Sequence, residues 1–233
     1  MTPVLQLVGI QKSYQSLRPL RVRELTIAPG ERVAIGGLDV GAAEVLVNLV
    51  TGASLPDQGE VRVQGKSTAE IVDGDEWLAS LDRFGIVSPR GVLLESATIE
   101  QNIAMPFTLD IDPVPDDVAA RVKALAASCG IARVDVTTGE AGADVRARVH
   151  LARAIALAPA LVVLEHPTAA LAKGTGRAFA RDLVAALDGA KLAALVITQD
   201  DEFAKHVAHR ALRLDGATGE LKPARSGWFR SLR

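Results

Sequence analysis

The sequence predicts an α/β fold in which buried parallel strands alternate with helices. Short apolar runs such as Leu161–Leu164 and Leu195–Thr198 are separated by stretches of helical periodicity such as Gly176–Leu187. Hydrophobic residues make up 48% of the 233 residues, which is enough for a substantial core. Aromatic residues are only 3%, so this core must be built from Ala, Val, Leu and Ile. Strand–helix alternation of this kind is typical of a sheet with parallel pairing.

The first half of the chain predicts strands around one helix, followed by further helices. The turn Ala28-Pro29-Gly30 separates two strands, and Gly36-Gly37 ends the second strand before a helix that stops at Gly52. Pro113-Val114-Pro115 breaks the chain between two later helices. The expected strands are Leu5–Val8, Val22–Ile27, Arg32–Ile35, Glu60–Val63 and Phe84–Val87, and the expected helices are Ala42–Val50, Thr98–Ala104 and Val118–Ser128.

The second half predicts a simpler alternation that closes on a strand. Its apolar runs have the length and β-branched content of buried strands, and its helical stretches are longer and amphipathic. The expected strands are Leu161–Leu164, Leu195–Thr198 and Ala211–Leu214, and the expected helices are Val145–Leu157, Gly176–Leu187 and Glu202–Ala208. A polar tail begins near Asp215.

Composition excludes several classes of protein. The formal net charge of −2, with no block of like charge before the C-terminus, does not indicate a nucleic-acid surface. The single Cys129 excludes an internal disulfide framework. No stretch has about 18 uninterrupted apolar residues, and Met1–Ile10 lacks the pattern of a signal peptide, so we expect any membrane role to involve a partner or a surface contact. No metal site is expected, because His150, His206 and His209 lack metal-ligand spacing with Cys129.

Three local patterns in a fixed order resemble one family. The first is the apolar strand that leads through Gly36-Gly37 into a helix, followed by Thr51-Gly52 and the residues QGEV at 58–61. The second is RVHLARAI at 148–155, and the third is LVVLEHPTAAL at 161–171. Each pattern alone is also compatible with ordinary core packing. Their order and spacing, together with TIEQNI at 98–103, resemble the ATP-binding subunits of ABC transporters over roughly residues 4–215.

This resemblance implies a fold and a division of the chain. The fold is an ABC-ATPase core of the P-loop NTPase type, with a mixed sheet and a small helical subdomain at about residues 90–150. The chain would form a single domain over residues 1–220, followed by a basic, aromatic tail at 221–233. The compact form is similar to exporter-type or lipid-trafficking (MCE-associated) subunits.

In the family, a glycine-rich loop wraps the β- and γ-phosphates of ATP, a lysine reaches them, and the next Ser or Thr holds Mg²⁺. Here Ala43 stands at the lysine position and Glu44 at the hydroxyl position, and Asp39 adds a further negative charge. Losing a charge-assisted contact costs about 1.5–3 kcal/mol, whereas a helix N-terminus favours an anion by about 1 kcal/mol. We therefore expect the loop to oppose nucleotide. One interpretation is that Glu44 itself occupies the anion position and caps its own helix. The loop reads GLDVGAAE at 37–44, and its relict nucleotide-site residues would be Gly37, Gly41, Ala42, Ala43 and Glu44.

The other nucleotide-site positions also depart from the family pattern. Glu165 replaces the Walker B Asp, where it could still coordinate a metal, and His166 replaces the catalytic Glu. Further replacements are Pro89 for the Q-loop Gln, Ala172 for the D-loop Asp and Gln199 for the switch His. Tyr14 alone matches the family, as the aromatic residue that stacks on adenine, although a half-buried Tyr at a strand end is an equal alternative.

The signature motif, Leu-Ser-Gly-Gly-Gln in the family, aligns with AGADV at 141–145. The family uses this segment to grip the γ-phosphate of ATP bound to the opposite subunit. Here the altered residues are Gly142, Ala143 and Asp144. Asp144 would place a carboxylate at the start of a helix, which suits helix capping and does not suit phosphate binding.

Two classes of function follow from these residues. The first is a catalytically degenerate subunit that binds no expected cofactor, pairs with a motif-competent ABC ATPase and docks a transmembrane subunit through the groove beside Pro89–Pro106. The second is an ATPase with non-consensus residues that uses Glu165 and His166. A free regulatory protein is a third, weaker reading. The first places the chain as a peripheral subunit on the cytoplasmic face of the inner membrane.

The C-terminal tail combines cationic and apolar residues without an acidic one. Its side chains are Lys222, Arg225, Arg230 and Arg233, interleaved with Trp228, Phe229 and Leu232. A solvated chain end and a contact with the membrane surface or the membrane subunit are both compatible with this composition.

Overall fold

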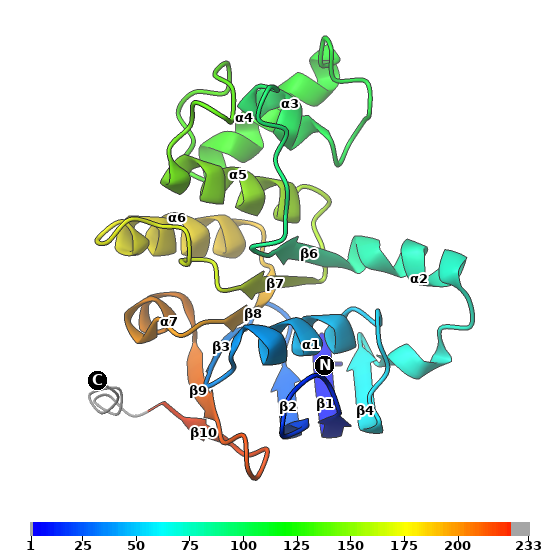
Figure 1. Cartoon of the computed structure of the whole chain (residues 1–233). Helices are drawn as coiled ribbons and strands as arrows, with labels where there is room; N and C mark the ends of the chain where they lie inside the picture. The colour runs from blue at the N-terminus through cyan, green and yellow to red at the C-terminus, as the bar shows by residue number, and fades with distance from the viewer. Residues whose placement is uncertain (1, 225–233) are drawn as a thin grey trace.

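The structure is a computed structural model that describes residues 2–224, and it contains two sheets (Figure 1). The six-stranded sheet has the order β10 (Leu221–Pro223), β9 (Arg210–Leu214), β3 (Arg32–Gly36), β8 (Ala193–Ile197), β7 (Leu161–Glu165) and β6 (Phe84–Val87). Its strands are parallel except for β10, which runs antiparallel to β9. The four-stranded antiparallel sheet has the order β2 (Leu20–Ile27), β1 (Leu5–Lys12), β4 (Gln58–Val63) and β5 (Lys66–Ser67). The α/β class with a mixed sheet is thus confirmed.

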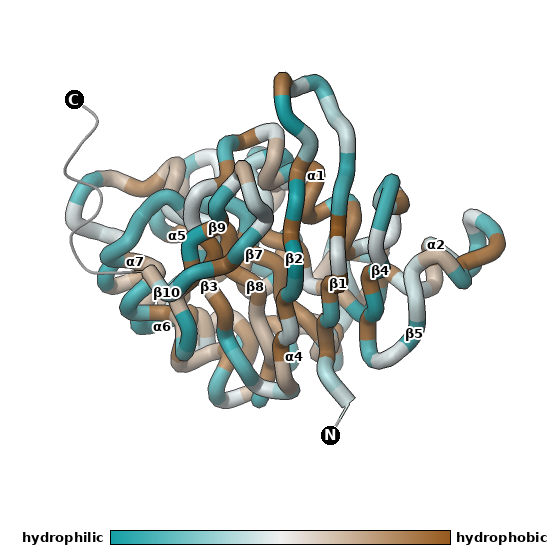
Figure 2. The backbone as a smooth tube through the Cα atoms, turned by 90° about the horizontal axis from the view of Figure 1, so that it is seen from below, coloured by the Kyte–Doolittle hydropathy of each residue, from teal (hydrophilic) through white to brown (hydrophobic). Residues whose placement is uncertain are grey.

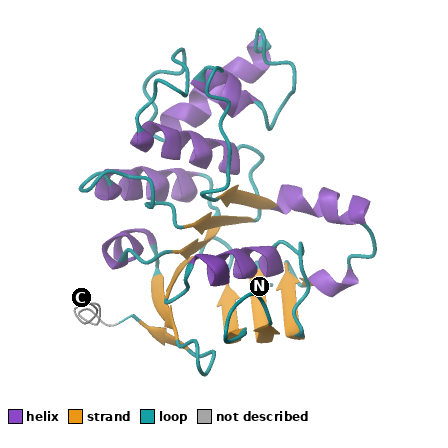
Figure 3. Ribbon diagram, in the orientation of Figure 1, coloured by secondary structure: helices purple, strands orange, loops and turns teal. Residues whose placement is uncertain are grey.

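Helices lie on both faces of the larger sheet (Figure 3). They are α1 (Val40–Val50), α2 (Gly74–Ser80), α3 (Ile99–Ala104), α4 (Asp116–Ser128), α5 (Ala143–Ile155), α6 (Gly176–Gly189) and α7 (Asp201–Val207), with short 3₁₀ turns at Thr68–Glu70 and Leu81–Arg83. Every residue of β7 and β8 is buried, as expected for parallel strands with both faces covered. No described helix has the length and apolarity required to span a membrane.

The core is divided in two by the larger sheet. Along β7, Leu161 and Val163 pack with α1 and the small sheet, whereas Val162 and Leu164 pack with α4, α5 and α6. This alternation follows from the two-residue period of a strand. Figure 2 shows the apolar residues concentrated along the central strands and polar residues along the outer loops. The site residues at the ends of these strands are therefore held by packing on both sides.

The helices α3, α4 and α5 form a layer above the sheet in the view of Figure 1. The helix α3 begins with a capping box in which Thr98 accepts a hydrogen bond from the Gln101 backbone, and the Gln101 side chain accepts one from Thr98. The fully buried Asn102 accepts from the backbone N–H of Leu94 at 2.9 Å and donates to its carbonyl at 3.0 Å. The chain that leaves β6 is thereby tied to the helical layer at Leu94.

Most predicted elements are confirmed, with boundaries that move by a few residues. The sequence did not predict α2 or β5, which are short and mostly polar. The helix α2 is attached to the rest of the chain through Trp77, which donates its indole N–H to the Thr51 carbonyl at 3.1 Å.

The C-terminal region departs from the predicted tail. Leu221–Pro223 form β10, and Lys222 pairs with Asp215 and Glu220 at 3.4 and 3.2 Å. The predictions for Arg225, Trp228, Phe229, Arg230, Leu232 and Arg233 lie outside the described residues.

Candidate functional site

The N-terminus of α1 carries a carboxylate from its own chain. The strand β3 leads into Gly37, whose φ is +87° and where a Cβ would lie 2.7 Å from the Leu214 carbonyl, so only glycine fits. The helix cap is Asp39, whose Oδ1 accepts the backbone N–H of Ala42 at 2.7 Å. The prediction that Glu44 caps this helix is therefore wrong, because the side chain at the start of the helix reaches the free N–H groups and the one in its second turn does not.

Glu44 instead faces an arginine that the sequence analysis did not select. Arg90 lies in the loop after β6, and its Nη1 is 3.1 Å from Glu44 Oε2. Its Nη2 is 2.8 Å from Glu165 Oε2, at the end of β7. The Ser88 hydroxyl donates to the same Glu165 oxygen at 2.8 Å. One guanidinium therefore bridges the two carboxylates that stand at the family's hydroxyl and Walker B positions.

Burial makes the Glu165 contacts the more important of the two pairs. The Glu165 side chain is 1% exposed, whereas those of Glu44 and Arg90 are 47% and 45% exposed. An uncompensated buried carboxylate is strongly destabilising, while a half-exposed pair contributes about 0–1 kcal/mol. Arg90 thus serves chiefly as the counter-charge of Glu165. No local sequence pattern indicates this contact, because Arg90 and Glu165 are 75 positions apart.

The ends of β7 and β8 bring the remaining predicted positions to the same edge of the sheet. The Gln199 side-chain amide donates to the Leu38 carbonyl, which ties the end of β8 to the loop before α1. The backbone N–H of His166 donates to the Ile197 carbonyl at 2.8 Å, and its φ is +45°. Its Nε2 is buried and has no hydrogen-bond partner in the described structure. Carboxyl ends of parallel strands meet at one edge, which explains this gathering.

Tyr14 lies against the start of α1. A Cβ built on Gly41 would be 3.5 Å from the Tyr14 ring, so the ring covers the turn that enters the helix. Beside it is a cleft of about 660 Å³, lined in part by Arg18, Arg21, Asp39 and Asp215. The role of Tyr14 in stacking on a base stays a prediction.

The segment predicted to correspond to the signature motif begins α5. Gly142 is the N-cap and makes no side-chain cap, while Asp144 lies in the first turn. The predicted carboxylate at the start of a helix is confirmed, and the Asp144 side chain pairs with Arg148, four residues along the helix, at 3.4 Å. A carboxylate in the first turn still interacts favourably with the helix dipole. The helix α5 lies in the helical layer, away from α1 (Figure 1).

A groove of about 310 Å³ lies between β6, the following loop and α5, and borders the predicted docking groove. Three large apolar side chains on it are unusually exposed: Ile86 at 42%, Val92 at 74% and Leu157 at 47%. The Val92 carbonyl accepts a hydrogen bond from Arg153 at 2.7 Å. His150 also lines the groove, and burial, together with the charge of Arg153, lowers its pKa.

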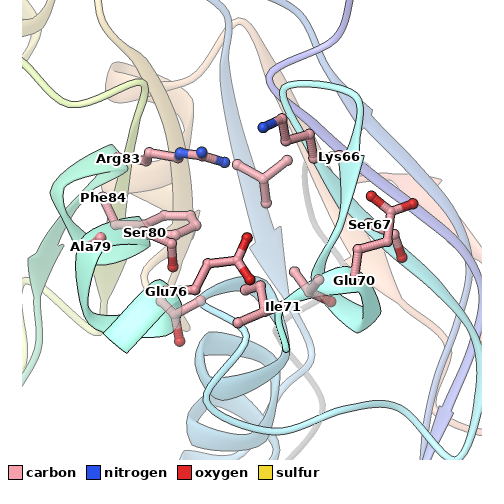
Figure 4. Close-up of a pocket in the computed structure, with 12 residues that line it drawn as sticks. Lys66, Ser67, Glu70, Ile71, Glu76, Ala79, Ser80, Arg83 and Phe84 are labelled. Atoms are coloured by element: carbon pink, nitrogen blue, oxygen red, sulfur yellow. The ribbon is translucent and has the colours of Figure 1, made fainter. Parts of the chain in front are cut away.

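A separate cavity of about 270 Å³ lies between β5 and α2 (Figure 4). Lys66 and Arg83 extend toward one another on one side of it, and Glu76 points in from another (Figure 4). Ile71 and Phe84 contribute apolar wall. None of the predicted site residues lines this cavity.

The magnesium and triphosphate that the resemblance implies do not fit the residues at α1. Where the family places a metal, the Arg90 guanidinium bridges Glu44 and Glu165. Where the family places a phosphate oxygen on the helix N-terminus, Asp39 already accepts the Ala42 N–H. Ala43 is fully buried and offers no charge. Side chains of the protein itself thus stand at both positions: Arg90 where the family places the metal, and Asp39 where it places a phosphate oxygen.

Comparisons with known proteins agree on one family. A family model described as ABC transporter matches residues 20–169. The lipoprotein-releasing system ATP-binding protein LolD of Chromohalobacter salexigens is 32% identical over 223 residues, which are 91% of each chain. LolD of Pseudomonas syringae pv. tomato is 31% identical and covers 91% of this chain and 95% of its own. The macrolide export ATP-binding/permease protein MacB of Bordetella avium is 30% identical over 88% of this chain, which spans only 32% of MacB.

Solved structures show the same fold. An ATP-binding cassette in a dimeric post-hydrolysis state, bound to ADP and Pi, superposes with a TM-score of 0.74 at 20% identity and covers 95% of this chain and 99% of its own. The structure of cbiO1 from Clostridium perfringens, part of the transporter complex cbiONQ, gives 0.80 at 19% identity, covering 95% and 88%. At these identities the similarity concerns the fold alone.

Proposed function

The chain belongs to the ABC transporter family as an ATP-binding domain, and we propose that it is a non-catalytic subunit of a membrane transporter. In this proposal it binds no Mg-ATP and serves as a structural or allosteric partner of an ATPase subunit with intact motifs. It lies at the cytoplasmic face of the membrane and contacts a transmembrane subunit.

The arginine bridge is the observation that best supports this function. A metal bound to Glu165 Oε2 would have to displace both the Arg90 guanidinium at 2.8 Å and the Ser88 hydroxyl at 2.8 Å. A triphosphate would lack the lysine contact, worth about 1.5–3 kcal/mol, and would lie beside Asp39. The favourable effect of the helix N-terminus is about 1 kcal/mol or less, so the unfavourable contributions dominate.

The groove between β6 and α5 supports the proposed contact with a transmembrane subunit. Its exposed Ile86, Val92 and Leu157 form an apolar surface around Gly91 and Pro106. Exposed apolar groups gathered in a groove favour the burial of a partner's apolar side chains. The names of the relatives refer to different transported substances: lipoproteins, Fe(3+) ions and macrolides. The proposal therefore concerns the assembly with other transporter subunits and leaves the transported substance open.

The second candidate is an ATPase that works with unusual residues. The Nε2 of His166 favours it, since this atom is buried and has no hydrogen-bond partner among residues 2–224. A positioned base contributes about 10²–10⁴-fold to a reaction. This candidate requires a bound Mg-ATP, and the same binding test therefore separates the two.

The test is thermal unfolding of the purified full chain with and without millimolar Mg-ATP. A ligand at about 100 times its Kd adds about 2.7 kcal/mol, which corresponds to roughly 5–10 °C for a domain of this size. We expect no rise for this chain and a clear rise for an ABC ATPase with intact motifs, measured as the control. A rise of several degrees in this chain would overturn the proposal and favour the second candidate.

A further inference from the structure

We propose that Arg90 is a built-in cation that takes the place of a bound metal and holds the segment Ser88–Val92, one wall of the groove, in position without any nucleotide. The proposal rests on the proposed function only in what it says about docking. The tether itself is a property of the isolated chain.

The first step is the charge balance at the end of β7. Glu44 and Glu165 both contact the same guanidinium. Two carboxylates brought near one another repel each other unless a cation lies between them. The planar guanidinium offers separate nitrogens to the two acids, Nη1 to Glu44 and Nη2 to Glu165. Within residues 2–224, the ion pairs of both acids are with Arg90. The chain thus provides by itself the positive charge that this edge of the sheet requires.

The second step is the anchoring of the segment that carries Arg90. At its inner end, Ser88 donates its hydroxyl to Glu165 and accepts the backbone N–H of Arg90 at 3.2 Å. The backbone N–H of Gly91 closes a turn on the Ser88 carbonyl at 2.9 Å. At its outer end, the Val92 carbonyl accepts from Arg153 of α5 at 2.7 Å. The segment is therefore fixed to the sheet on one side and to the helical layer on the other.

The third step links the anchor to the groove. Gly91 and Val92 line the groove directly, two residues or fewer from Arg90. There is little room for the segment to shift, because a Cβ on Gly91 would lie 3.1 Å from the Ser88 carbonyl and 3.3 Å from the His150 ring. The position of this wall thus depends on contacts that need no ligand. A partner that docks here would find the same surface whether or not nucleotide is present.

One consequence separates this inference from a simple loss of motif residues. Restoring a lysine at Ala43 and a serine at Glu44 would leave Arg90 paired with Glu165. The exposed contact between Arg90 and Glu44 would be lost, and the contact between Arg90 and the buried Glu165 would remain. By this inference Arg90, and not only Ala43 and Glu44 of α1, determines which cation this site accepts.

The test is hydrogen exchange of the full-length chain, followed at the peptide that covers residues 88–94. We expect Arg90→Gln to speed exchange there about tenfold, as expected from the loss of one charge-assisted hydrogen bond discounted for partial exposure. Arg90→Lys should restore part of the protection from exchange, because lysine keeps the positive charge but lacks the planar guanidinium that can contact two carboxylates at once. Peptides from β8 should be unchanged. The matched control is Arg133→Gln, which removes an exposed arginine paired with the exposed Asp135.

A second variant covers the case in which Arg90→Gln does not fold. Arg90→Gln/Glu165→Gln removes the buried charge together with its partner and should fold while exchange at 88–94 remains fast. Unchanged exchange at 88–94 in either folded variant would overturn the inference. So would a slowing of exchange in the wild-type chain on addition of magnesium alone, because a metal would then be the missing anchor.

These outcomes are independent of those for the proposed function. If the wild-type chain binds Mg-ATP but Arg90→Gln loosens the segment, the tether stands and the non-catalytic role fails. If the wild-type chain binds no Mg-ATP and Arg90→Gln changes nothing, the role stands and the tether fails.

Discussion

Replacing Arg148 with methionine should destabilise the chain by about 2–4 kcal/mol. The Arg148 side chain is 7% exposed and its Nη2 is 2.8 Å from Asp182, which is 14% exposed. Arg148 also donates to the Asp144 carbonyl at 2.9 Å, and its guanidinium lies 5.9 Å from the Phe179 ring centroid. Breaking a buried pair costs about 3–5 kcal/mol. The estimate is lower because Asp182 keeps a second partner, Arg181, at 2.9 Å.

The pH dependence of the stability provides a second test of the Arg148–Asp182 pair. Burial by itself raises the pKa of Asp182, but hydrogen bonds and charges from Arg148 and Arg181 outweigh it, so the pKa is lowered. A lowered folded-state pKa adds stability above the unfolded value of about 3.9, and that stability is lost as the pH falls through the folded value. The Arg148→Met variant should therefore show a weaker loss of stability below about pH 4.

The assay is urea unfolding at neutral pH, compared with unfolding at acid pH. The midpoint should shift while the denaturant slope stays constant, because the exposed surface is unchanged. Arg181→Met is the matched control, since that side chain is 77% exposed and an exposed pair contributes about 0.2–1 kcal/mol. A cost for Arg148→Met within about 0.5 kcal/mol of the control would refute the reasoning.

Three further predictions concern the thiol, the assembly and the C-terminus. Burial raises the pKa of Cys129 to about 11, so the thiol should react with a disulfide reagent at pH 8 only as fast as the chain opens, and immediate reaction would contradict its burial. A transporter purified through this chain should contain a second ATP-binding subunit with intact motifs, and mass spectrometry finding two copies of this chain and no other ATPase would contradict the heteromer. Ending the chain after Ala224 keeps β10 and should lower recovery with the membrane fraction; equal recovery of the truncated and full-length chains would assign the tail no membrane contact.

The candidate site was predictable in position but not in its contacts. The order of the motifs placed Asp39 just before a helix and Glu44 within that helix, where the structure has them. It also placed Glu165 and Gln199 at or just after the ends of strands, which the structure confirms. The sequence could not show that Asp39 caps α1 and Glu44 does not. That choice depends on the direction of each side chain relative to the helix axis, which spacing alone does not specify.

The sequence by itself determined the strands and helices whose burial is regular. All-apolar runs such as β7 and β8 can be stable only between two layers, so their place in the core follows from composition. Short polar elements such as α2 and β5 were missed, because their apolar contacts come from distant parts of the chain and leave no periodic pattern. Trp77 of α2, for example, is held by the Thr51 carbonyl.

Only the tertiary structure decided how the charges of the site are balanced. Glu165 and Arg90 are 75 positions apart, and their contact exists because β6 and β7 are parallel neighbours whose carboxyl ends meet. Local sequence preferences act over a few residues, whereas a buried carboxylate selects its counter-charge from whatever the fold brings within reach. The composition fixed how many cations were available, and the register of two strands determined which of them neutralises Glu165.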